Sequence, residues 1–347
     1  MFVRAALVAT ILAAVIAAGS VSGAAAPKAV GAATAAHPAA IEEATRLSFR
    51  LRPVDGVEFV PNARNVAIRS QAAGPLLLFL PATRSVPNDY REFLDAASSV
   101  GYHVLALDYW NRGRSVAQTC AEDAHCYGAL QANRFDGSHP TAYSSVSQND
   151  SILARLTHAL QTLQRRDPAG GWERYLGAHG VRWNRIVLAG HSQGGGESAF
   201  IAHGHRVQGV LMFASPVESD NGIVADWMER AGVTPTSRYF GFDATHDMYF
   251  DRIQGSWAAL GLGSHGPQAV IASDAPPTGS RTVVTDLDLG GPDAAHSLIV
   301  TDAGPRGERN VPLFRDVWLW MLRAVRSAAA GTPGHSEAIL HAVSAVP

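Results

Sequence analysis

The stretch that most constrains the fold is Arg185–Gly196, which reads RIVLAGHSQGGG. Its first half, Ile186 to Ala189, is a short apolar run with β-branched residues and predicts a buried strand. Its second half, residues 190–194, matches G-x-S-x-G, in which a strand turns sharply into a helix and a serine stands at the turn. We therefore expect a strand, a turn that exposes the Ser192 hydroxyl at the edge of a sheet, and a helix over about residues 194–204.

The glycines of this stretch have a steric role. Gly190 and Gly194 flank the serine where strand and helix must cross closely, which leaves no room for a Cβ. The free N–H groups at the start of the helix can stabilise negative charge that develops beside the serine. Because the chain holds 33 glycines, the five-residue pattern alone is weak, and the apolar strand before it supplies the specificity.

The segment Gly190-His-Ser-Gln-Gly-Gly resembles the α/β-hydrolase superfamily. Further stretches resemble a group of exported bacterial serine hydrolases within it: Asp89-Tyr-Arg-Glu-Phe-Leu, Gly101-Tyr-His-Val-Leu-Ala-Leu-Asp-Tyr, Cys126-Tyr-Gly-Ala and Arg238-Tyr-Phe-Gly-Phe. The resemblance spans about residues 75–325. It implies an α/β-hydrolase fold, with a mostly parallel central sheet between helices, and a serine-hydrolase chemistry, but it implies no substrate.

The pattern of elements agrees with a parallel sheet covered on both faces. Strands are expected at 75–81, 102–109, 186–189, 210–214, 238–242 and 281–286, and helices at 86–100, 150–166, 194–204, 221–231, 251–260 and 311–330. A hairpin is expected within 46–60 and a strand at 65–70. The interpretation is one domain over residues 44–330, with a loosely ordered tail at 331–347.

Residues 111–147 show no clean periodicity and form a long excursion, which we expect to cover the site and shape its pocket. They contain both cysteines, Cys120 and Cys126. An even cysteine count in an exported chain favours a disulfide, and the resemblance also carries a cysteine pair here. Two free thiols remain the alternative. A metal site would need further ligands, and only His125 is close in sequence.

The N-terminus predicts export. Met1 to about residue 25 combines Arg4, an apolar core from Ala5 to Ala18 and a small-residue exit, which is typical of a bacterial signal peptide. The core is short for a transmembrane helix, so no stable membrane insertion is expected, and an uncleaved anchor is the alternative. Residues 26–43 are expected to be a flexible lead-in, and the location to be secreted or periplasmic. With 28 basic against 30 acidic residues, no nucleic acid partner is indicated.

A serine becomes a nucleophile when a base removes its proton, and in this fold the partners follow in the order acid, then histidine. His296 fits the base, because it lies in a predicted loop between the strand ending near Asp286 and the closing helix. Two acids follow the strand 239–242, Asp243 and Asp247. Asp243 directly abuts the strand, and the resemblance places the shared acid five residues after Phe-Gly-Phe, so Asp247 is preferred and Asp243 is the alternative.

The oxyanion hole needs two backbone N–H groups. One is expected from Gln193, after the nucleophile, and the other from Thr83, in the turn after the strand 75–81. Ala82 is the alternative donor, and it departs from the glycine that many relatives carry at this position. His203 and His205 are expected to lie at a helix C-terminus rather than to bind metal, and neither metal nor cofactor is expected.

The combined hypothesis is a secreted serine hydrolase, with a carboxylic ester as the preferred substrate, acting through Ser192, His296 and an aspartate by way of an acyl-enzyme. The expected partner is a small-molecule or polymeric ester. Two alternatives stay open. A peptidase or amidase could use the same triad, and a catalytically silent binding protein could share the scaffold, since fold does not fix function.

Overall fold

The computed structural model describes residues 44–331, apart from positions 55, 57, 72, 139, 273–275, 277 and 278. The expected signal peptide, the lead-in and, except for Gly331, the tail lie outside these residues. All described residues fall within one compact unit. Within them, no helix combines the length and the apolar character that crossing a bilayer requires.

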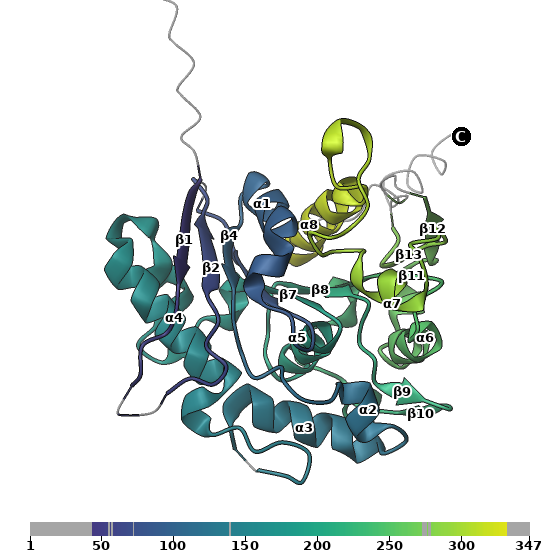
Figure 1. Cartoon of the computed structure of the whole chain (residues 1–347), viewed down its shortest axis with the longest axis horizontal. Coiled ribbons are helices and arrows are strands. Elements are labelled where there is room, and N and C mark those ends of the chain that lie inside the picture. The colour runs from purple at the N-terminus through teal and green to yellow at the C-terminus, as the bar shows by residue number, and fades with distance from the viewer. Residues whose placement is uncertain are drawn as a thin grey trace, which may run out of the picture. The chain divides into compact units, whose positions relative to one another are not determined.

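In the described part of the chain, nine strands form one sheet in the order β1-β2-β4-β3-β7-β8-β11-β13-β12 (Figure 1). Their bounds, in that order, are Thr45–Phe49, Asn65–Arg69, His103–Ala106, Leu76–Leu80, Ile186–His191, Gly209–Phe213, Tyr239–Ala244, Thr282–Thr285 and Ala269–Ile271. Strand β2 runs antiparallel to both β1 and β4, and the other neighbours are parallel. The predicted mostly parallel sheet is therefore confirmed.

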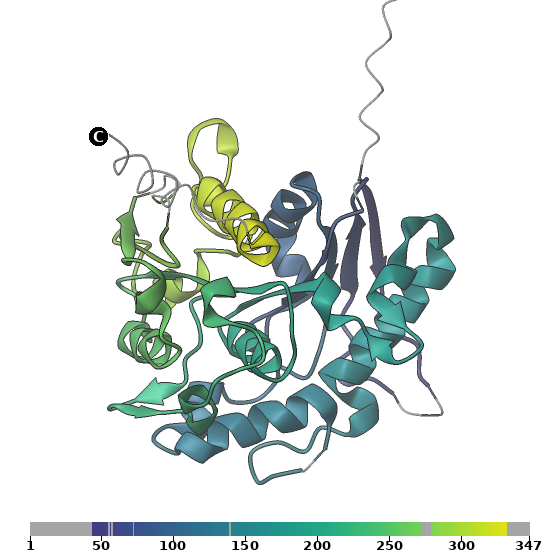
Figure 2. The same cartoon turned by 180° about the vertical axis from the view of Figure 1, so that it is seen from behind.

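The sheet lies between two layers of helices (Figures 1 and 2). Helices α1 and α8 lie side by side on one face, and α5 lies on the other, with α3 beyond it. The helix bounds are α1 Arg91–Ser99, α2 Val116–Cys120, α3 Ala124–Asp136, α4 Ile152–Arg166, α5 Gln193–Gly204, α6 Phe250–Ala259, α7 Pro292–Ser297 and α8 Arg315–Ala330. The predicted helices at 86–100, 150–166, 194–204, 251–260 and 311–330 are confirmed within a few residues at each end.

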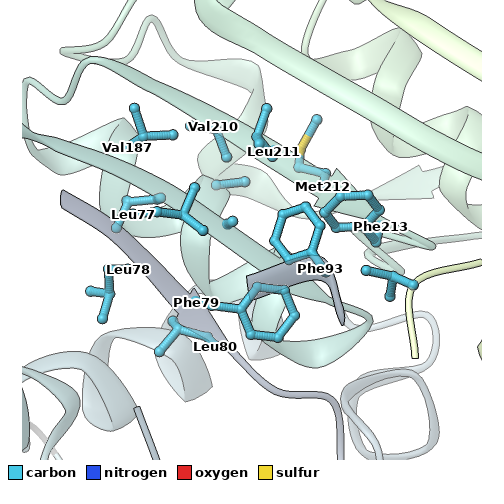
Figure 3. Close-up of a cluster of buried hydrophobic side chains, with 14 of the residues drawn as sticks. Leu77, Leu78, Phe79, Leu80, Phe93, Val187, Val210, Leu211, Met212 and Phe213 are labelled. Carbon is cyan, nitrogen blue, oxygen red and sulfur yellow. The ribbon is translucent and has the colours of Figure 1, made fainter. Parts of the chain in front are cut away.

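The centre of the core is β3, in which every side chain from Leu76 to Leu80 is 0% exposed. A strand covered on both faces carries a continuous apolar run instead of an alternating one, which is the pattern of this segment. Figure 3 shows Phe93 of α1 lying between β3 and β8, with its ring centroid 5.4 Å from that of Phe79 and 4.9 Å from that of Phe213. Burial of each such side chain contributes about 1.5–3 kcal/mol, so the middle of the sheet is a stable base for the loops at its edge.

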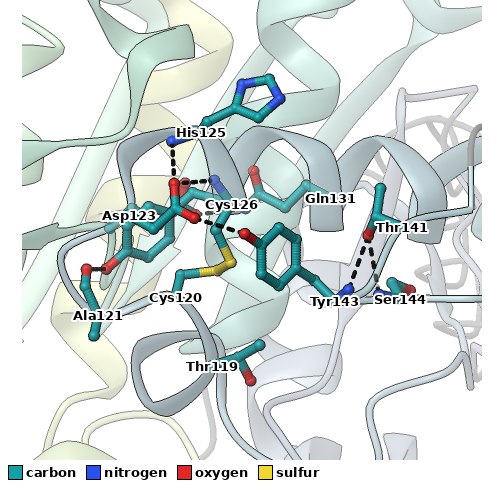
Figure 4. The surroundings of a disulfide bond; sticks show 12 residues. Thr119, Cys120, Ala121, Asp123, His125, Cys126, Gln131, Thr141, Tyr143 and Ser144 are labelled. Carbon is teal, nitrogen blue, oxygen red and sulfur yellow. Dashed lines mark hydrogen bonds between the residues drawn. A yellow bond between two sulfur atoms is a disulfide. The ribbon is translucent and has the colours of Figure 1, made fainter.

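Residues 111–147, which we call the cover, are more regular than expected, because they contain α2 and α3. The period of α3 was hidden because three of its polar residues, Gln131, Asn133 and Arg134, point inward and are buried. The predicted disulfide between Cys120 and Cys126 is present and joins the end of α2 to the first turn of α3 (Figure 4).

Four expectations are wrong or incomplete. The hairpin is formed by β1 with β2 across residues 50–64, and not within 46–60. The expected helix at 221–231 is instead the pair β9 (Ser219–Asp220) and β10 (Ile223–Val224), followed by a single turn. Its reversal at Asn221 and Gly222 has φ values of +48° and +81°, the left-handed conformations that an Asn-Gly hairpin turn requires. Strand β12 and the short pair β5 (Leu176–Gly177) with β6 (Gly180–Val181) were not foreseen, and His296 lies in α7, not in a loop.

Candidate active site

The segment 190–194 forms the expected turn between β7 and α5. Ser192 has φ +52° and ψ −118°, a strained conformation for a residue with a side chain. The neighbouring glycines permit it: a Cβ on Gly190 would lie 2.2 Å from the carbonyl oxygen of Gly194, and one on Gly194 would lie 2.0 Å from that of Leu80. The strand β3, the turn and the helix α5 are therefore in backbone contact at Ser192.

Three of the predicted residues meet at this turn. His296 Nε2 lies 2.8 Å from Ser192 Oγ, and His296 Nδ1 lies 2.7 Å from Asp247 Oδ2. The side chain of Asp247 is 0% exposed and that of His296 is 11% exposed. With Nδ1–H donating to the carboxylate, Nε2 is free to accept the serine proton, which is the geometry that a general base needs.

The alternative acid, Asp243, lies close by but does not contact the imidazole. It is the penultimate residue of β11, is fully buried, and accepts a hydrogen bond from the N–H of Ala244 at 2.8 Å. Burial, followed by the charge of Asp247, raises the pKa of Asp243 well above its usual range, which favours the protonated form of this carboxyl. Asp247 is held by the N–H of Tyr249, which donates to its Oδ1 at 2.6 Å. Asp243 thus belongs to the strand β11, and Asp247 to the turn that follows it.

The structure also separates the two candidate oxyanion donors. The N–H of Ala82 donates to Tyr90 Oη at 3.1 Å and is therefore committed. Thr83 Oγ1 donates to Gln193 Oε1 at 2.9 Å, which ties the turn after β3 to the start of α5. Among hydrogen bonds of the described residues, none uses the backbone N–H of Thr83 or Gln193 as donor. These two N–H groups remain available to an oxyanion beside Ser192.

A buried hydrogen-bond series that sequence reasoning missed connects these parts. His191 Nε2 lies 2.9 Å from the carbonyl oxygen of His296, and Tyr90 Oη lies 2.9 Å from His191 Nδ1. Since a carbonyl only accepts, Nε2 carries the proton and Nδ1 accepts from Tyr90. Burial, with the nearby charge of His296, lowers the pKa of His191 to about 3, so the ring is neutral. The series runs from the N–H of Ala82 through both side chains to the backbone of His296.

Beside Ser192 lies a small, partly open hollow with a volume of about 10 Å³. It is lined by Thr83, Ser115, Val116, Ala117, Ser192, Gln193, Val217, Glu218 and Tyr249. The cover supplies Ser115, Val116 and Ala117, as expected of a segment that shapes the pocket. Tyr249 also packs edge-on against His296, with ring centroids 5.2 Å apart.

Glu218 is a second residue that the sequence did not single out, because its segment has no motif. Burial raises the pKa of its carboxyl to about 7.

Among the residues that the structure describes, no group of three or more His, Cys, Asp or Glu side chains is arranged to hold a metal ion. His203 and His205 have other contacts: His203 Nε2 bonds to the carbonyl of Arg230, and His205 stacks on Trp183.

No protein-family profile matches the chain, and no curated protein matches it in sequence. Solved structures are similar to it at low identity. Carboxyl esterase 2 of the fungus Tuber melanosporum has 10% identity, 83% coverage of this chain and 88% of its own, and a TM-score of 0.43. Esterase LipW of Mycobacterium marinum has 13% identity, 84% and 83% coverage, and a TM-score of 0.42. An acylaminoacyl peptidase of Pyrococcus horikoshii has 12% identity, 74% and 39% coverage, and a TM-score of 0.40.

The arrangement of the chain itself gives the fold. An antiparallel β2 precedes a run of parallel strands, and the turn with Ser192 follows β7. Asp247 follows β11 and His296 follows β13, which is the order of these residues in the α/β-hydrolase fold. The chain therefore has the α/β-hydrolase fold.

Proposed function

We propose that the protein is a serine hydrolase that cleaves carboxylic esters. The observation that carries this proposal is the pair of short contacts from His296, 2.8 Å to Ser192 Oγ and 2.7 Å to Asp247 Oδ2. A serine activated by a base whose tautomer a carboxylate fixes is the arrangement used for acyl transfer.

The reaction would proceed in two halves. Ser192 Oγ attacks the ester carbonyl while His296 Nε2 takes its proton, and the tetrahedral oxyanion is held by the N–H groups of Thr83 and Gln193. The C–O bond to the alcohol then breaks, and His296 gives its proton to the leaving oxygen. Water attacks the acyl-enzyme with His296 again as base, which releases the acid and restores the serine.

The pocket favours a particular size of substrate. The hollow beside Ser192 is small, about 10 Å³, and the cover bounds one side of it, so it suits a short acyl group better than a polypeptide segment. This is the reason to prefer an ester over a peptide, although the same triad serves both reactions. Export is part of the proposal and is supported by the N-terminal sequence and by the Cys120–Cys126 disulfide, which persists in oxidising compartments.

A labelling and activity experiment tests the proposal. We expect a fluorophosphonate probe to label Ser192, and p-nitrophenyl esters of two to four carbons to be hydrolysed faster than those of eight. The matched p-nitroanilides should be cleaved at least a hundredfold more slowly. Faster cleavage of the anilides would establish an amidase instead, and absence of both label and hydrolysis would leave a binding protein on this scaffold.

A further inference from the structure

Glu218 is a buried acidic residue that lines the pocket of Ser192 and has no part in the triad. Its side chain is 1% exposed, yet it lines the same hollow as Ser192 and Thr83. His296 already has Asp247 as its partner, so the attack on the substrate needs no second carboxylate here. The rest of the pocket wall is largely apolar, which makes one acid in it a selective feature.

Hydrogen bonds to three separate segments hold Glu218 in place, two through its carboxyl and one through its backbone. Gln131 of α3 donates to Oε1, and Trp227 Nε1 donates to Oε2 at 2.8 Å. The backbone N–H of Glu218 donates to Ser256 Oγ of α6 at 3.1 Å. Each carboxylate oxygen can accept more than one hydrogen bond, so these two donors leave acceptor capacity on both oxygens.

The third glycine after the nucleophile makes room for this group. A Cβ on Gly196 would lie 2.4 Å from Glu218 Oε1, so any larger residue would displace the carboxyl from the first turn of α5. Neither the turn at Ser192 nor the contact with β3 requires glycine at this position, because Gly190 and Gly194 make those approaches. The absence of a side chain at Gly196 therefore leaves space for the Glu218 carboxyl beside the first turn of α5.

The surrounding charges leave this region short of cations. Arg134 of α3 and Glu197 of α5 are both buried next to Glu218, with 3.8 Å between Arg134 Nη1 and Glu197 Oε1. Tyr127 of α3 is the other titratable group near it, and Arg252 of α6 is engaged with Tyr127 Oη at 2.7 Å. One guanidinium faces two carboxyls, and burial raises the pKa of both, so a ligand that brings a donor or a positive charge would stabilise the charged form of Glu218.

We propose that Glu218 determines specificity by receiving a hydrogen-bond donor, either a hydroxyl or an ammonium, at the end of a short acyl group bound in this pocket. This inference rests on the proposed serine-hydrolase function and names its substrate class. A buried carboxylate that loses its intended partner is costly, so an acyl group that ends in a methyl should be a poorer substrate than one of equal size that ends in a donor.

Three p-nitrophenyl esters of equal length test this directly: butanoate, 3-hydroxypropanoate and 3-aminopropanoate, whose acyl groups end in CH₃, OH and NH₃⁺. We expect kcat/KM of the wild type to favour the hydroxyl and ammonium esters over butanoate by at least tenfold. In Glu218→Gln the amide oxygen still accepts from a hydroxyl, so the hydroxyl preference should persist while the ammonium preference falls at least tenfold. Ratios between substrates do not depend on how much enzyme is active.

Asp220→Asn is the matched control, because it removes an acid two residues away that does not line this pocket, and it should leave both ratios unchanged. The pH dependence of the wild type gives a readout that needs no variant. With the pKa of Glu218 at about 7, the ratio of the ammonium ester to butanoate should rise from pH 6 to 8, and the hydroxyl ratio should change less. Any pH effect that is common to the reaction of all three esters cancels in these ratios.

A wild type that prefers butanoate, or a Glu218→Gln variant that keeps the full ammonium preference, would overturn the assignment while leaving the hydrolase intact. Failure of all three esters, without fluorophosphonate labelling of Ser192, would instead overturn the proposed function and this inference with it.

Discussion

Two regions meet at the pocket and are built differently. The elbow side, made of β3, β7 and α5, rests on two strands, β3 and β7, whose residues are buried and, apart from His191, apolar. The cover, residues 111–147, packs through buried polar groups of α3, and a disulfide links its helices α2 and α3 to each other. The reacting atoms belong to the elbow side and its neighbouring loops, whereas the cover forms part of the pocket wall. Under the proposed function, the sheet would fix the chemistry and the cover would influence which substrate enters.

The largest effect should come from the elbow side. Ser192→Ala should lower kcat by about ten-thousandfold or more, because removal of a triad member typically costs several orders of magnitude, and it should leave the unfolding midpoint unchanged. Ser198→Ala is the matched control, since Ser198 is buried in the same helix and donates to Gly194 O at 2.8 Å without contacting His296. An active Ser192→Ala variant at equal purity would contradict the serine mechanism.

The next largest effect should distinguish Asp247 from Asp243 by the kcat of their asparagine variants. Asp247→Asn should lose roughly ten-thousandfold in kcat, by analogy with the handling of the imidazole tautomer in serine proteases. Asp243→Asn should stay within tenfold of the wild type, because Asp243 makes no hydrogen bond to His296 and an amide preserves its acceptor for the N–H of Ala244. Steady-state kinetics of both variants decide the matter, and the reverse result would make Asp243 the triad acid.

These residues also mark how far the sequence could predict the structure. The turn at Ser192 could be predicted from sequence because a continuous apolar strand and its neighbouring glycines are local features. The order of Asp247 and His296 along the chain could be predicted from the order of the strands. The helix α3 was missed because its buried face carries Gln131 and Arg134, which removes the apolar period. The roles of Tyr90, His191 and Glu218 arise from contacts between segments tens to more than a hundred residues apart, which no local pattern contains.

Glu218, which bonds to the cover through Gln131, and His191, which belongs to the elbow side, should respond to pH in opposite senses. Native Glu218, with a pKa of about 7, binds a proton that the unfolded chain releases above its ordinary 4.5, so its contribution to stability is lost as pH rises from 4.5 to 7. For His191, with a pKa of about 3, the loss occurs as pH falls from 6.5 to 3. Between pH 5 and 8, Glu218→Gln should lose up to about 3 kcal/mol less unfolding free energy than the wild type, measured by urea titration. Equal losses would contradict the shift at Glu218.

The disulfide should stabilise the cover modestly. Its cysteines are six residues apart, and a loop this short predicts about 2 kcal/mol from chain entropy. The double variant Cys120→Ser with Cys126→Ser should therefore unfold at lower urea and show a raised KM, because Val116 and Ala117 line the pocket in the adjoining helix. Labelling of Ser192 should continue. Unchanged KM and stability would mean that the cover is held without the covalent bond.

The smallest effect tests the connection within the catalytic side. Tyr90 Oη accepts from the N–H of Ala82 and bonds to His191, which in turn holds the carbonyl of His296. Tyr90→Phe removes both bonds and leaves buried groups without partners, which costs about 1–3 kcal/mol of stability. If the series also keeps the oxyanion turn and His296 in register, kcat should fall about tenfold while KM changes little, because the pocket wall is untouched.

A second tyrosine separates this positioning role from stability alone. Tyr102 is equally buried, and its hydroxyl donates to the carbonyl of Leu322 in α8 at 2.7 Å, on the face of the sheet opposite α5. Tyr102→Phe should therefore reduce the unfolding free energy to a similar extent and leave kcat at the wild-type value. If both variants lose the same fraction of kcat, Tyr90 contributes to stability only, and the hydrogen bonds from the oxyanion turn to His296 do not affect the rate. If only Tyr90→Phe is slow, the alignment of the triad depends on backbone contacts that lie outside the triad itself.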